Sequence, residues 1–270
     1  MTDEDTPQVS ACKVSDEFSD AVSDITLPRS TLPTNSLLLL TATLCDSVSP
    51  SLEKRTLELL PGSQSASIAR NRREKDRRLR ILVRLLLAEG LRLLEGMTLA
   101  ASLERLDWDD KGRPVIRESG WECSFSHSHK LALCLIGPGH IYGRLGVDAE
   151  RIHPLSLADV AAAFCREEQE SITGDPDCQN RLFAFWTRKE AALKVLGKGF
   201  LQEPSTVNML SPWPIPSLQN LWSQNITLAK HPEYAVALAA ENGSPKSTYC
   251  LSPFSLDITA RTPRDLLLSL

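Results

Sequence analysis

An uncharged apolar run at residues 36–45, SLLLLTATLC, limits the fold more than any other feature of the chain. Runs of this length without charge are typical of a buried β-strand. A second run of the same kind, LALCLI, lies at residues 131–136 inside an extended stretch, Cys123–Ile136. We expect this stretch to form a hairpin with a returning strand at Ile141–Glu150, across the tight connection of residues 137–140.

The segment Ala66–Glu95 is the strongest helix candidate, and its first half is strongly basic. Eight of the fifteen residues from Arg70 to Arg84 are Lys or Arg, and an apolar stripe follows at helical spacing. A basic run of this kind is either a solvated helix face or a phosphate-binding surface. A second helix is predicted at Asn180–Leu196, closed by Gly197. Together with the strands, these helices predict a mixed α and β fold.

Composition bounds the class of protein. The chain has 270 residues, enough for one large domain or two modest ones. Its net charge of −4 excludes a general binder of polyanions, so nucleic acid is not an expected partner. Seven scattered cysteines without a C-x-x-C pair indicate neither a disulfide framework nor a structural zinc site, which favours a cytoplasmic protein. We see no secretory signal and no segment apolar enough to cross a membrane, and we expect no membrane partner.

Two carboxylates share one face of a predicted strand at Gly146–Glu150. Because side chains alternate along a strand, Val147 and Ala149 point into a core while Asp148 and Glu150 point together to the other side. Neighbouring carboxylates repel each other, and a pair that is partly buried favours a bound cation. Oxygen ligands of this type suit Mg²⁺. Two solvated acids on an exposed strand face are the alternative.

The sequence FWTRKEAALK at residues 185–194 places polar groups on one face of the second helix. Trp186, Glu190 and Lys194 are spaced by four residues and therefore lie on the same face. Glu190 and Lys194 could form a surface ion pair, or one could bind a metal and the other a phosphate. Lys189 and Lys198 lie nearby in the sequence, and three lysines close to one acid favour a phosphoanhydride ligand.

A histidine between small hydroxyl residues precedes the second apolar run, in the sequence SFSHS at residues 124–128. A lone histidine is more often structural, and a phosphate contact or proton relay is the alternative for His127. A Ser–His hydrolase is a weak interpretation, because the chain has no nucleophile elbow of the G-x-S-x-G type.

These motifs together resemble the surfactin-type 4′-phosphopantetheinyl transferases. The resemblance extends over about residues 37–243, where the order and spacing of the motifs match. A strand predicted at Tyr234–Ala240 also resembles the late strand of the family. The motifs are Gly112–Pro114, Ser126–Ser128, Gly146–Glu150, Trp186–Lys194 and Gly197–Phe200.

The resemblance implies an α+β fold, a pseudodimer of two similar halves with antiparallel sheets and packed helices, and an active site in the cleft between them. The implied division of the chain is a flexible acidic tail at residues 1–36, an N-terminal half at 37–145, a C-terminal half with the metal site at 146–243, and a C-terminal extension at 244–270.

The resemblance also assigns residues. Asp148, Glu150 and Glu190 match the three acids that hold Mg²⁺. His127, preceded by Ser126, matches a contact to the 3′-phosphate of coenzyme A, and Lys194, assisted by Lys189, matches a contact to the other phosphates. Further candidates for the coenzyme site are the turn residues Arg113 and Pro114 and the basic residues Arg72, Arg73, Arg80 and Arg84.

The implied reaction moves the phosphopantetheine arm of coenzyme A onto a serine of an apo acyl or peptidyl carrier protein and releases adenosine 3′,5′-bisphosphate. Lys194 would stabilise phosphate charge, and Glu190 or a metal-bound water would take the serine proton. The partner is expected to be acidic, and the enzyme to be a monomer. The alternative is a coenzyme A- or nucleotide-binding protein without catalytic activity.

Overall fold

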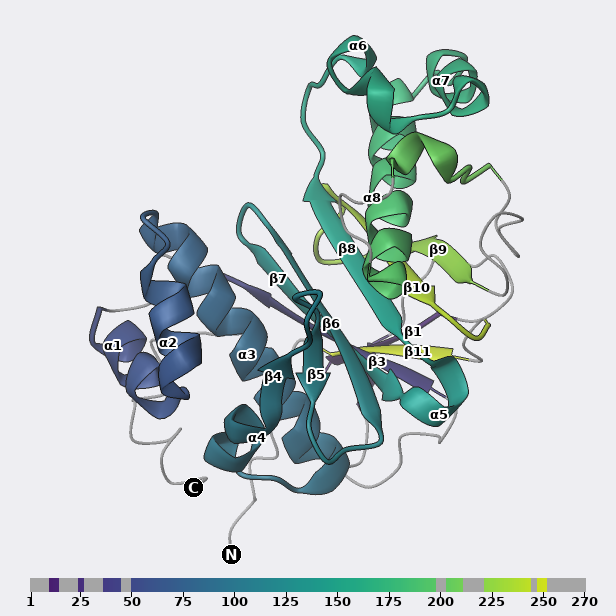
Figure 1. Cartoon of the computed structure of the whole chain (residues 1–270). Coiled ribbons are helices and arrows are strands. Elements are labelled where there is room, and N and C mark those ends of the chain that lie inside the picture. The colour runs from purple at the N-terminus through teal and green to yellow at the C-terminus, as the bar shows by residue number, and fades with distance from the viewer. Residues whose placement is uncertain are drawn as a thin grey trace, which may run out of the picture.

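The computed structural model describes residues 10–14, 24–26, 36–44, 50–197, 203–210, 221–243 and 247–251. Within them the chain is an α+β protein in which helices pack against mainly antiparallel sheets, with one parallel pair in the larger sheet (Figure 1). In the first part of the chain the elements are β3 (Ser36–Thr43), α1 (Pro50–Leu59), α2 (Gly62–Ala69), α3 (Glu74–Glu95), α4 (Leu99–Arg105), β4 (Leu106–Trp108), β5 (Pro114–Ile116), β6 (Trp121–Ser128), β7 (Leu131–Pro138) and α5 (Gly139–Tyr142).

The second part of the chain contains a smaller sheet and its own long helix. No helix in the described residues is long and apolar enough to span a bilayer. The elements are β8 (Leu145–Arg151), α6 (Leu157–Val160), a 3-10 turn (Ala161–Ala163), α7 (Arg166–Thr173), α8 (Cys178–Leu196), a 3-10 turn (Pro204–Thr206), β9 (Trp222–Ile226) and β10 (Tyr234–Ala240).

The two sheets repeat one connectivity. In the first, strand β3 is followed by the long helix α3 and then by β6 and β7, and the strands lie in the order β3-β7-β6. In the second, β8 is followed by α8 and then by β9 and β10, in the order β8-β10-β9. All neighbours within these two triplets are antiparallel. Each long helix therefore lies across a sheet of the same topology (Figure 1).

The larger sheet also contains strands from both ends of the chain. Its full order is β2-β1-β11-β3-β7-β6, where β1 is Ser10–Val14, β2 is Asp24–Thr26 and β11 is Ser247–Leu251. These strands fall within the expected tail and the expected C-terminal extension. The expected flexible tail stays a prediction, and the rest of residues 1–35 lies outside the described part of the chain.

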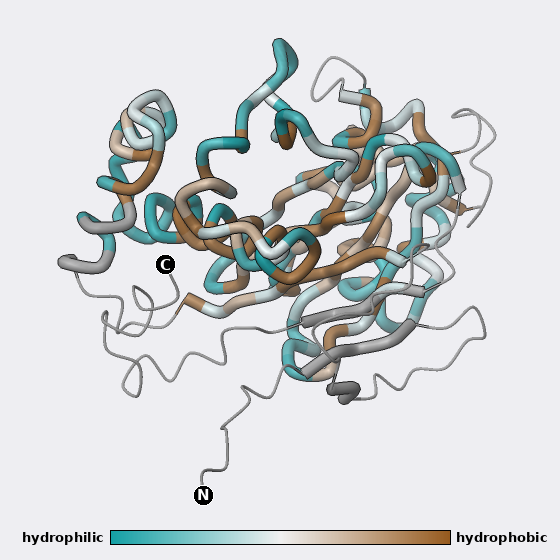
Figure 2. The backbone as a smooth tube through the Cα atoms, turned by 90° about the horizontal axis from the view of Figure 1, so that it is seen from below, coloured by the Kyte–Doolittle hydropathy of each residue, from teal (hydrophilic) through white to brown (hydrophobic). Residues whose placement is uncertain are grey.

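Within the apolar run at 36–45, residues Ser36–Thr43 form strand β3, which is buried on both faces up to Ala42 and therefore does not alternate with polar residues. Leu38 and Leu40 pack under helix α3. Leu37 and Leu39 face the opposite way, into a second core shared with Val147 and Val236 of the smaller sheet. The two sheets are thus joined by a common apolar layer, visible as the hydrophobic strands in the middle of the molecule (Figure 2).

The predicted helix Ala66–Glu95 is two helices, α2 and α3, separated by residues 70–73. The side-chain amide of Asn71 donates to the carbonyls of Ser67 and Ile68, both at 3.1 Å, and so satisfies the end of α2. The Arg77 guanidinium donates to the carbonyls of Asn71 and Arg72 at 3.2 and 3.3 Å. Side-chain bonds of this kind compete with a continuous helix, and they end α2 where the charge pattern alone predicted continuity.

The predicted hairpin between residues 131–136 and 141–150 is also wrong. Strand β7 forms its hairpin with the preceding strand β6, whose pairing runs from Trp121 opposite Pro138 to Ser128 opposite Leu131. Strand β8 instead begins the second sheet and pairs with β10. The short helix α5 separates β7 from β8 and directs the chain into the second sheet.

Helix α8 lies unusually close to strand β8. A Cβ atom at Gly146 would lie 1.9 Å from the carbonyl oxygen of Ala191, so only glycine fits at this position. The helix ends at Gly197, which adopts a left-handed conformation with φ of 62°, as its predicted closing role requires. This close packing sets the polar side chains of α8 beside those of β8.

Candidate active site

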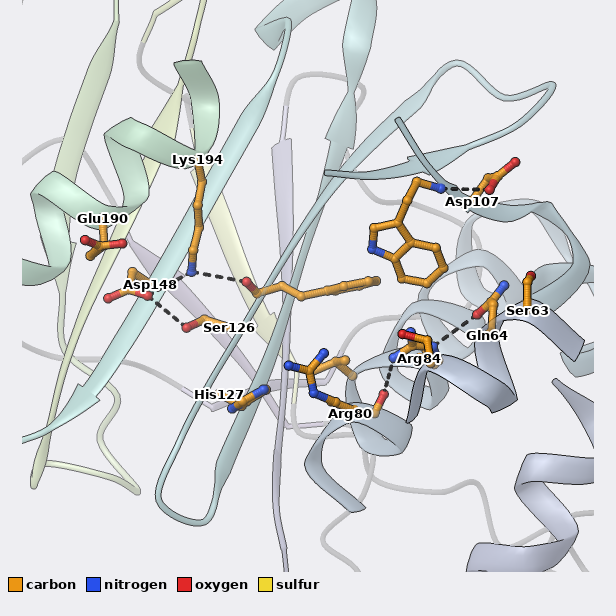
Figure 3. Close-up of a pocket in the computed structure, with 14 residues that line it drawn as sticks. Ser63, Gln64, Arg80, Arg84, Asp107, Ser126, His127, Asp148, Glu190 and Lys194 are labelled. Atoms are coloured by element: carbon orange, nitrogen blue, oxygen red, sulfur yellow. Dashed lines mark hydrogen bonds and ion pairs between the residues drawn. The ribbon is translucent and has the colours of Figure 1, made fainter. Parts of the chain in front are cut away.

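A cavity of about 580 Å³ lies where the two sheet-and-helix units meet (Figure 3). One side is lined by residues of α2, α3, β4 and β6, and the other by residues of β8 and α8. Its volume is that of a typical small-molecule site. Asp148 and Glu190 lie with Lys194 at the β8–α8 end, and Arg80 and Arg84 lie on the α3 side, where Asp107 also lines the cavity (Figure 3).

Asp148 is the most buried acid of the cavity, with 5% of its surface exposed. Its Oδ1 accepts hydrogen bonds from the Ser126 hydroxyl at 3.0 Å and from the Lys194 ammonium at 2.8 Å. Its Oδ2 is buried and has no hydrogen-bond partner among the described residues. A buried carboxylate oxygen without a partner is costly, so this atom marks a place for a cation or a donor.

Glu150 and Glu190 are half-buried acids whose carboxyl groups both lie within the electrostatic influence of Asp148. The Ser128 hydroxyl donates to Oε2 of Glu150 at 2.7 Å. Burial raises the pKa of Glu150, and the Asp148 carboxylate adds to this effect. Burial likewise raises the pKa of Glu190, with further contributions from Asp148 and Glu150. The three carboxylates therefore repel one another in a setting that favours a bound cation.

The residues fit a hard cation at Asp148, but they do not already form a complete set of ligands. In the part of the chain that the structure describes, no three His, Cys, Asp or Glu side chains stand together as a metal-binding group. Asp148 and Glu190 line the cavity, whereas Glu150 does not. The unpartnered oxygen of Asp148 and the oxygen-only character of the three acids fit Mg²⁺.

Lys194 lies at the cavity with all three of its N–H groups in use. Its ammonium donates to the carbonyls of Phe125 at 3.2 Å and Val147 at 2.7 Å, and to Asp148. The bonds to Phe125 and Val147 connect α8 to both β6 and β8. In this arrangement Lys194 neutralises Asp148 and has no N–H left for another ligand.

The basic end of the cavity is formed by Arg80 and His127, which point toward one another in Figure 3. Burial lowers the pKa of His127, and the charges of Arg80 and Lys194 lower it further. The imidazole is therefore largely neutral at pH 7. Arg80 is exposed on α3, and its charge is available to an anion in the cavity.

Arg84 lines the same cavity but is held by the chain. Its Nε donates to Oε1 of Gln64 at 3.0 Å and its Nη1 to the carbonyl of Arg80 at 2.6 Å. The guanidinium also stacks on Trp108, 4.7 Å from the ring centroid. Burial lowers the pKa of Arg84 to about 10, so the side chain stays charged at neutral pH. These contacts fix a cationic wall made from α2, α3 and β4.

The other sequence candidates lie outside the cavity lining. Arg72 and Arg73 are exposed in the connection between α2 and α3. Arg113 donates through Nε to Asp109 at 2.8 Å, and its guanidinium packs against Gly197 at the end of α8. Pro114 begins β5 opposite Trp108, so it supports a lining residue. The predicted coenzyme contacts of these four residues are not visible in the lining, and Lys198 lies outside the described residues.

Lys189 requires a correction, because it does not reach the cavity. Its side chain is 2% exposed and forms an ion pair of 2.8 Å with Glu168, which is fully buried. The ammonium also donates to the carbonyls of Pro204, at 2.8 Å, and Val207. Consecutive residues of a helix differ in direction by about 100°, so Lys189 points into the interior while Glu190 faces the cavity.

Ser126 also differs from its expected role. Its hydroxyl donates to Asp148 and accepts from the backbone N–H of Ala149 at 3.2 Å. Both bonds are internal, so the side chain supports an acid of the site. The sequence reasoning missed Gln64 and Trp108, and only the place of Trp108 beside the 109–114 turn could have indicated its role.

The fold and the cavity define an α+β protein whose two sheet-and-helix units enclose one site with basic and acidic ends. Residues 144–242 match the family model of the 4′-phosphopantetheinyl transferase superfamily. The resemblance to 4′-phosphopantetheinyl transferases is thereby confirmed at the level of the superfamily.

Two curated relatives support the same family. The chain is 33% identical over 130 residues to the 4′-phosphopantetheinyl transferase HetI of Nostoc sp., which is 44% of this chain and 53% of the relative. It is 28% identical over 94 residues to the 4′-phosphopantetheinyl transferase psf-1 of Bacillus pumilus, which is 34% of this chain and 39% of the relative. The matched stretch thus spans about half of one relative and less of the other.

Proposed function

We propose that the chain transfers the 4′-phosphopantetheine arm of coenzyme A to a serine of an apo acyl or peptidyl carrier protein. The observation that carries the proposal is the cavity itself, which has Arg80 and His127 at one end and Asp148, Glu190 and Lys194 at the other. A nucleotide with phosphate groups at two separate positions of its ribose matches this distribution of charge. Coenzyme A has its 3′-phosphate and its diphosphate in that relation.

Arg80 and His127 would take the 3′-phosphate. A guanidinium forms strong charge-assisted bonds with phosphate oxygens, and Arg80 has no ion-pair partner among the described residues. A bound phosphate would favour protonation of His127, which burial and neighbouring cations oppose in the free protein. Arg84 adds positive charge without leaving its own partners.

Asp148, Glu150 and Glu190 would hold Mg²⁺, which neutralises charge on the diphosphate when it is bound. The unpartnered oxygen of Asp148 supports this assignment. Glu150 and Glu190 complete the set of acids, and their pKa values are raised when no cation balances them. Lys194 would stabilise charge in the same region from its place beside Asp148.

The reaction follows from this placement. The carrier serine oxygen attacks the β-phosphorus of the diphosphate, and a new oxygen–phosphorus bond forms as the bond from that phosphorus to the bridging oxygen breaks. The bridging oxygen leaves with adenosine 3′,5′-bisphosphate. Glu190, which lines the cavity, or a metal-bound water would accept the serine proton.

The repeated connectivity of the two sheets supports a pseudodimer of similar halves with the site in the cleft between them. A chain that supplies both halves can act as a monomer in the cytoplasm. The carrier partner would be acidic near its modified serine, and fatty-acid, polyketide and peptide carriers all fit this chemistry.

Mass spectrometry of an apo-carrier tests the function. After incubation with coenzyme A and Mg²⁺, we expect the carrier to gain one phosphopantetheine arm. Asp148→Ala and Glu190→Ala should nearly abolish the gain and keep the fold, whereas Asp110→Ala, an exposed acid of the 109–114 turn, should retain it. Coenzyme A binding without mass gain on any of several carriers would favour a non-catalytic coenzyme-binding protein.

A further inference from the structure

Three serines of β6 hold β8 by their side chains. Ser124, Ser126 and Ser128 alternate along β6 and point toward β8, which belongs to the other sheet. Their hydroxyl oxygens accept the backbone N–H groups of Val147, Ala149 and Arg151 at 3.1, 3.2 and 3.1 Å. Strands β6 and β8 are thus joined at the two-residue period of a strand by hydroxyl groups that act in place of backbone carbonyls.

The same hydroxyls hold the acids. Each serine that accepts the N–H of one residue of β8 also faces the side chain of the residue before it. Ser126 accepts from Ala149 and donates to Asp148, and Ser128 accepts from Arg151 and donates to Glu150. Ser124 accepts from Val147 and would face residue 146, which is glycine. The contact between β6 and β8, called the serine joint below, therefore consists of Ser124, Ser126 and Ser128, and the last two also contact a carboxylate.

We propose that Ser126 and Ser128 are positioning residues for the metal-binding carboxylates, an inference that rests on the proposed function. A hydroxyl has one proton, and the bond accepted from the backbone fixes the oxygen, so the proton is directed to a single carboxylate oxygen. At Asp148, the tied oxygen is Oδ1 and the partnerless oxygen is Oδ2. The serines thus leave one oxygen of the carboxylate for the cation.

Ser124 provides a matched control within the same joint. Its removal leaves the buried N–H of Val147 without its acceptor but changes no acid. We therefore compare Ser124→Ala, Ser126→Ala and Ser128→Ala with the wild type, using Mn²⁺ as a probe and its electron paramagnetic resonance signal to count the free ion. Thermal unfolding is measured for every variant, and Ser128→Thr restores a hydroxyl at the most exposed of the three positions.

We expect Ser128→Ala and Ser126→Ala to weaken Mn²⁺ binding about tenfold, as loss of a hydrogen-bond partner of a metal ligand does. Ser124→Ala should lower the unfolding temperature and bind Mn²⁺ as the wild type does, and Ser128→Thr should recover most of the lost affinity. In transfer assays, a higher Mg²⁺ concentration should restore the rate of Ser128→Ala. Ser124→Ala should need no more Mg²⁺ than the wild type.

Equal Mn²⁺ affinity in all three alanine variants would overturn the inference and leave the serines as a joint alone. Absence of Mn²⁺ binding in the folded wild type would overturn it as well. If the wild type binds Mn²⁺ and the variants differ as expected, but no carrier is modified, the positioning role stands and the proposed transfer falls.

Discussion

The buried ion pair between Lys189 and Glu168 gives the sharpest test of the site assignment. Lys189 is 2% exposed and Glu168 is fully buried, and their charged atoms are 2.8 Å apart. Oε1 of Glu168 also accepts from the backbone of Met209 at 2.7 Å, and Oε2 from that of Cys165 at 2.9 Å. The pair thus ties α7, α8 and residues 203–210 together inside the second half of the molecule.

We expect Lys189→Met to be strongly destabilising, because it leaves the Glu168 carboxylate buried without its counter-ion. Removal of one partner of a buried pair costs about 3–5 kcal/mol. At about 2–4 °C per kcal/mol for a chain of this size, the unfolding temperature should fall by roughly 6–20 °C. The Michaelis constant for coenzyme A should stay unchanged at a temperature where the variant is folded, since Lys189 does not line the cavity.

The size of the pair interaction itself is accessible from a double-mutant cycle. Glu168→Gln removes the charge and keeps one carbonyl oxygen, which can accept from only one of the two backbone N–H groups of Cys165 and Met209. The coupling between Lys189→Met and Glu168→Gln, measured by urea unfolding, should be about 1.5–3 kcal/mol, the range of a charge-assisted hydrogen bond. A Lys189→Met protein that unfolds like the wild type and has a raised Michaelis constant for coenzyme A would refute the interior placement and restore the phosphate role.

Three further predictions concern the cavity and its frame. Gly146→Ala should lower the free energy of unfolding by about 1–3 kcal/mol and impair transfer, because the new methyl group meets the Ala191 carbonyl; unchanged urea unfolding would contradict this. Arg80→Ala should raise the Michaelis constant for coenzyme A by about tenfold or more but leave that for dephospho-coenzyme A unchanged; equal effects on both would remove the 3′-phosphate contact. The affinity for coenzyme A should increase as the pH falls below 6.5 and His127 becomes charged, since burial holds its pKa below that ordinary value; His127→Gln should abolish this dependence, and a variant that retains it would contradict the assignment.

The sequence predicted those helices and strands whose burial pattern is visible within the element itself. The strand within the uncharged run at 36–45, the strand at 145–150 and the helix closed by Gly197 are all present, because an uncharged run, alternating side chains and an apolar helical stripe are each visible in the residues of the element itself. The partner of a strand leaves no such trace. The hairpin expected for residues 131–136 was therefore assigned to the wrong neighbour, and the real partner is β6.

The sequence predicted only those site residues that lie on the same face of one helix or strand. The spacing of Glu190 and Lys194 placed both at the cavity. Lys189, on the same helix, points into the interior, where it pairs with Glu168 of α7. No pattern within residues 185–194 predicts this partner. The interruption between α2 and α3 at residues 70–73 depends on side-chain hydrogen bonds from Asn71 and Arg77. The pattern of charged residues does not predict these bonds.

The position of β11 has a consequence for how this chain can be divided. Residues 247–251 run parallel to β3 and fill the place between β3 and β1. A fragment that stops near residue 145 would lack this strand and leave one edge of the long apolar β3 unpaired. Such an edge favours pairing with another molecule. The sheet of the first half is thus completed by a strand that follows the second half in the sequence. We therefore expect that the first half, expressed alone, aggregates.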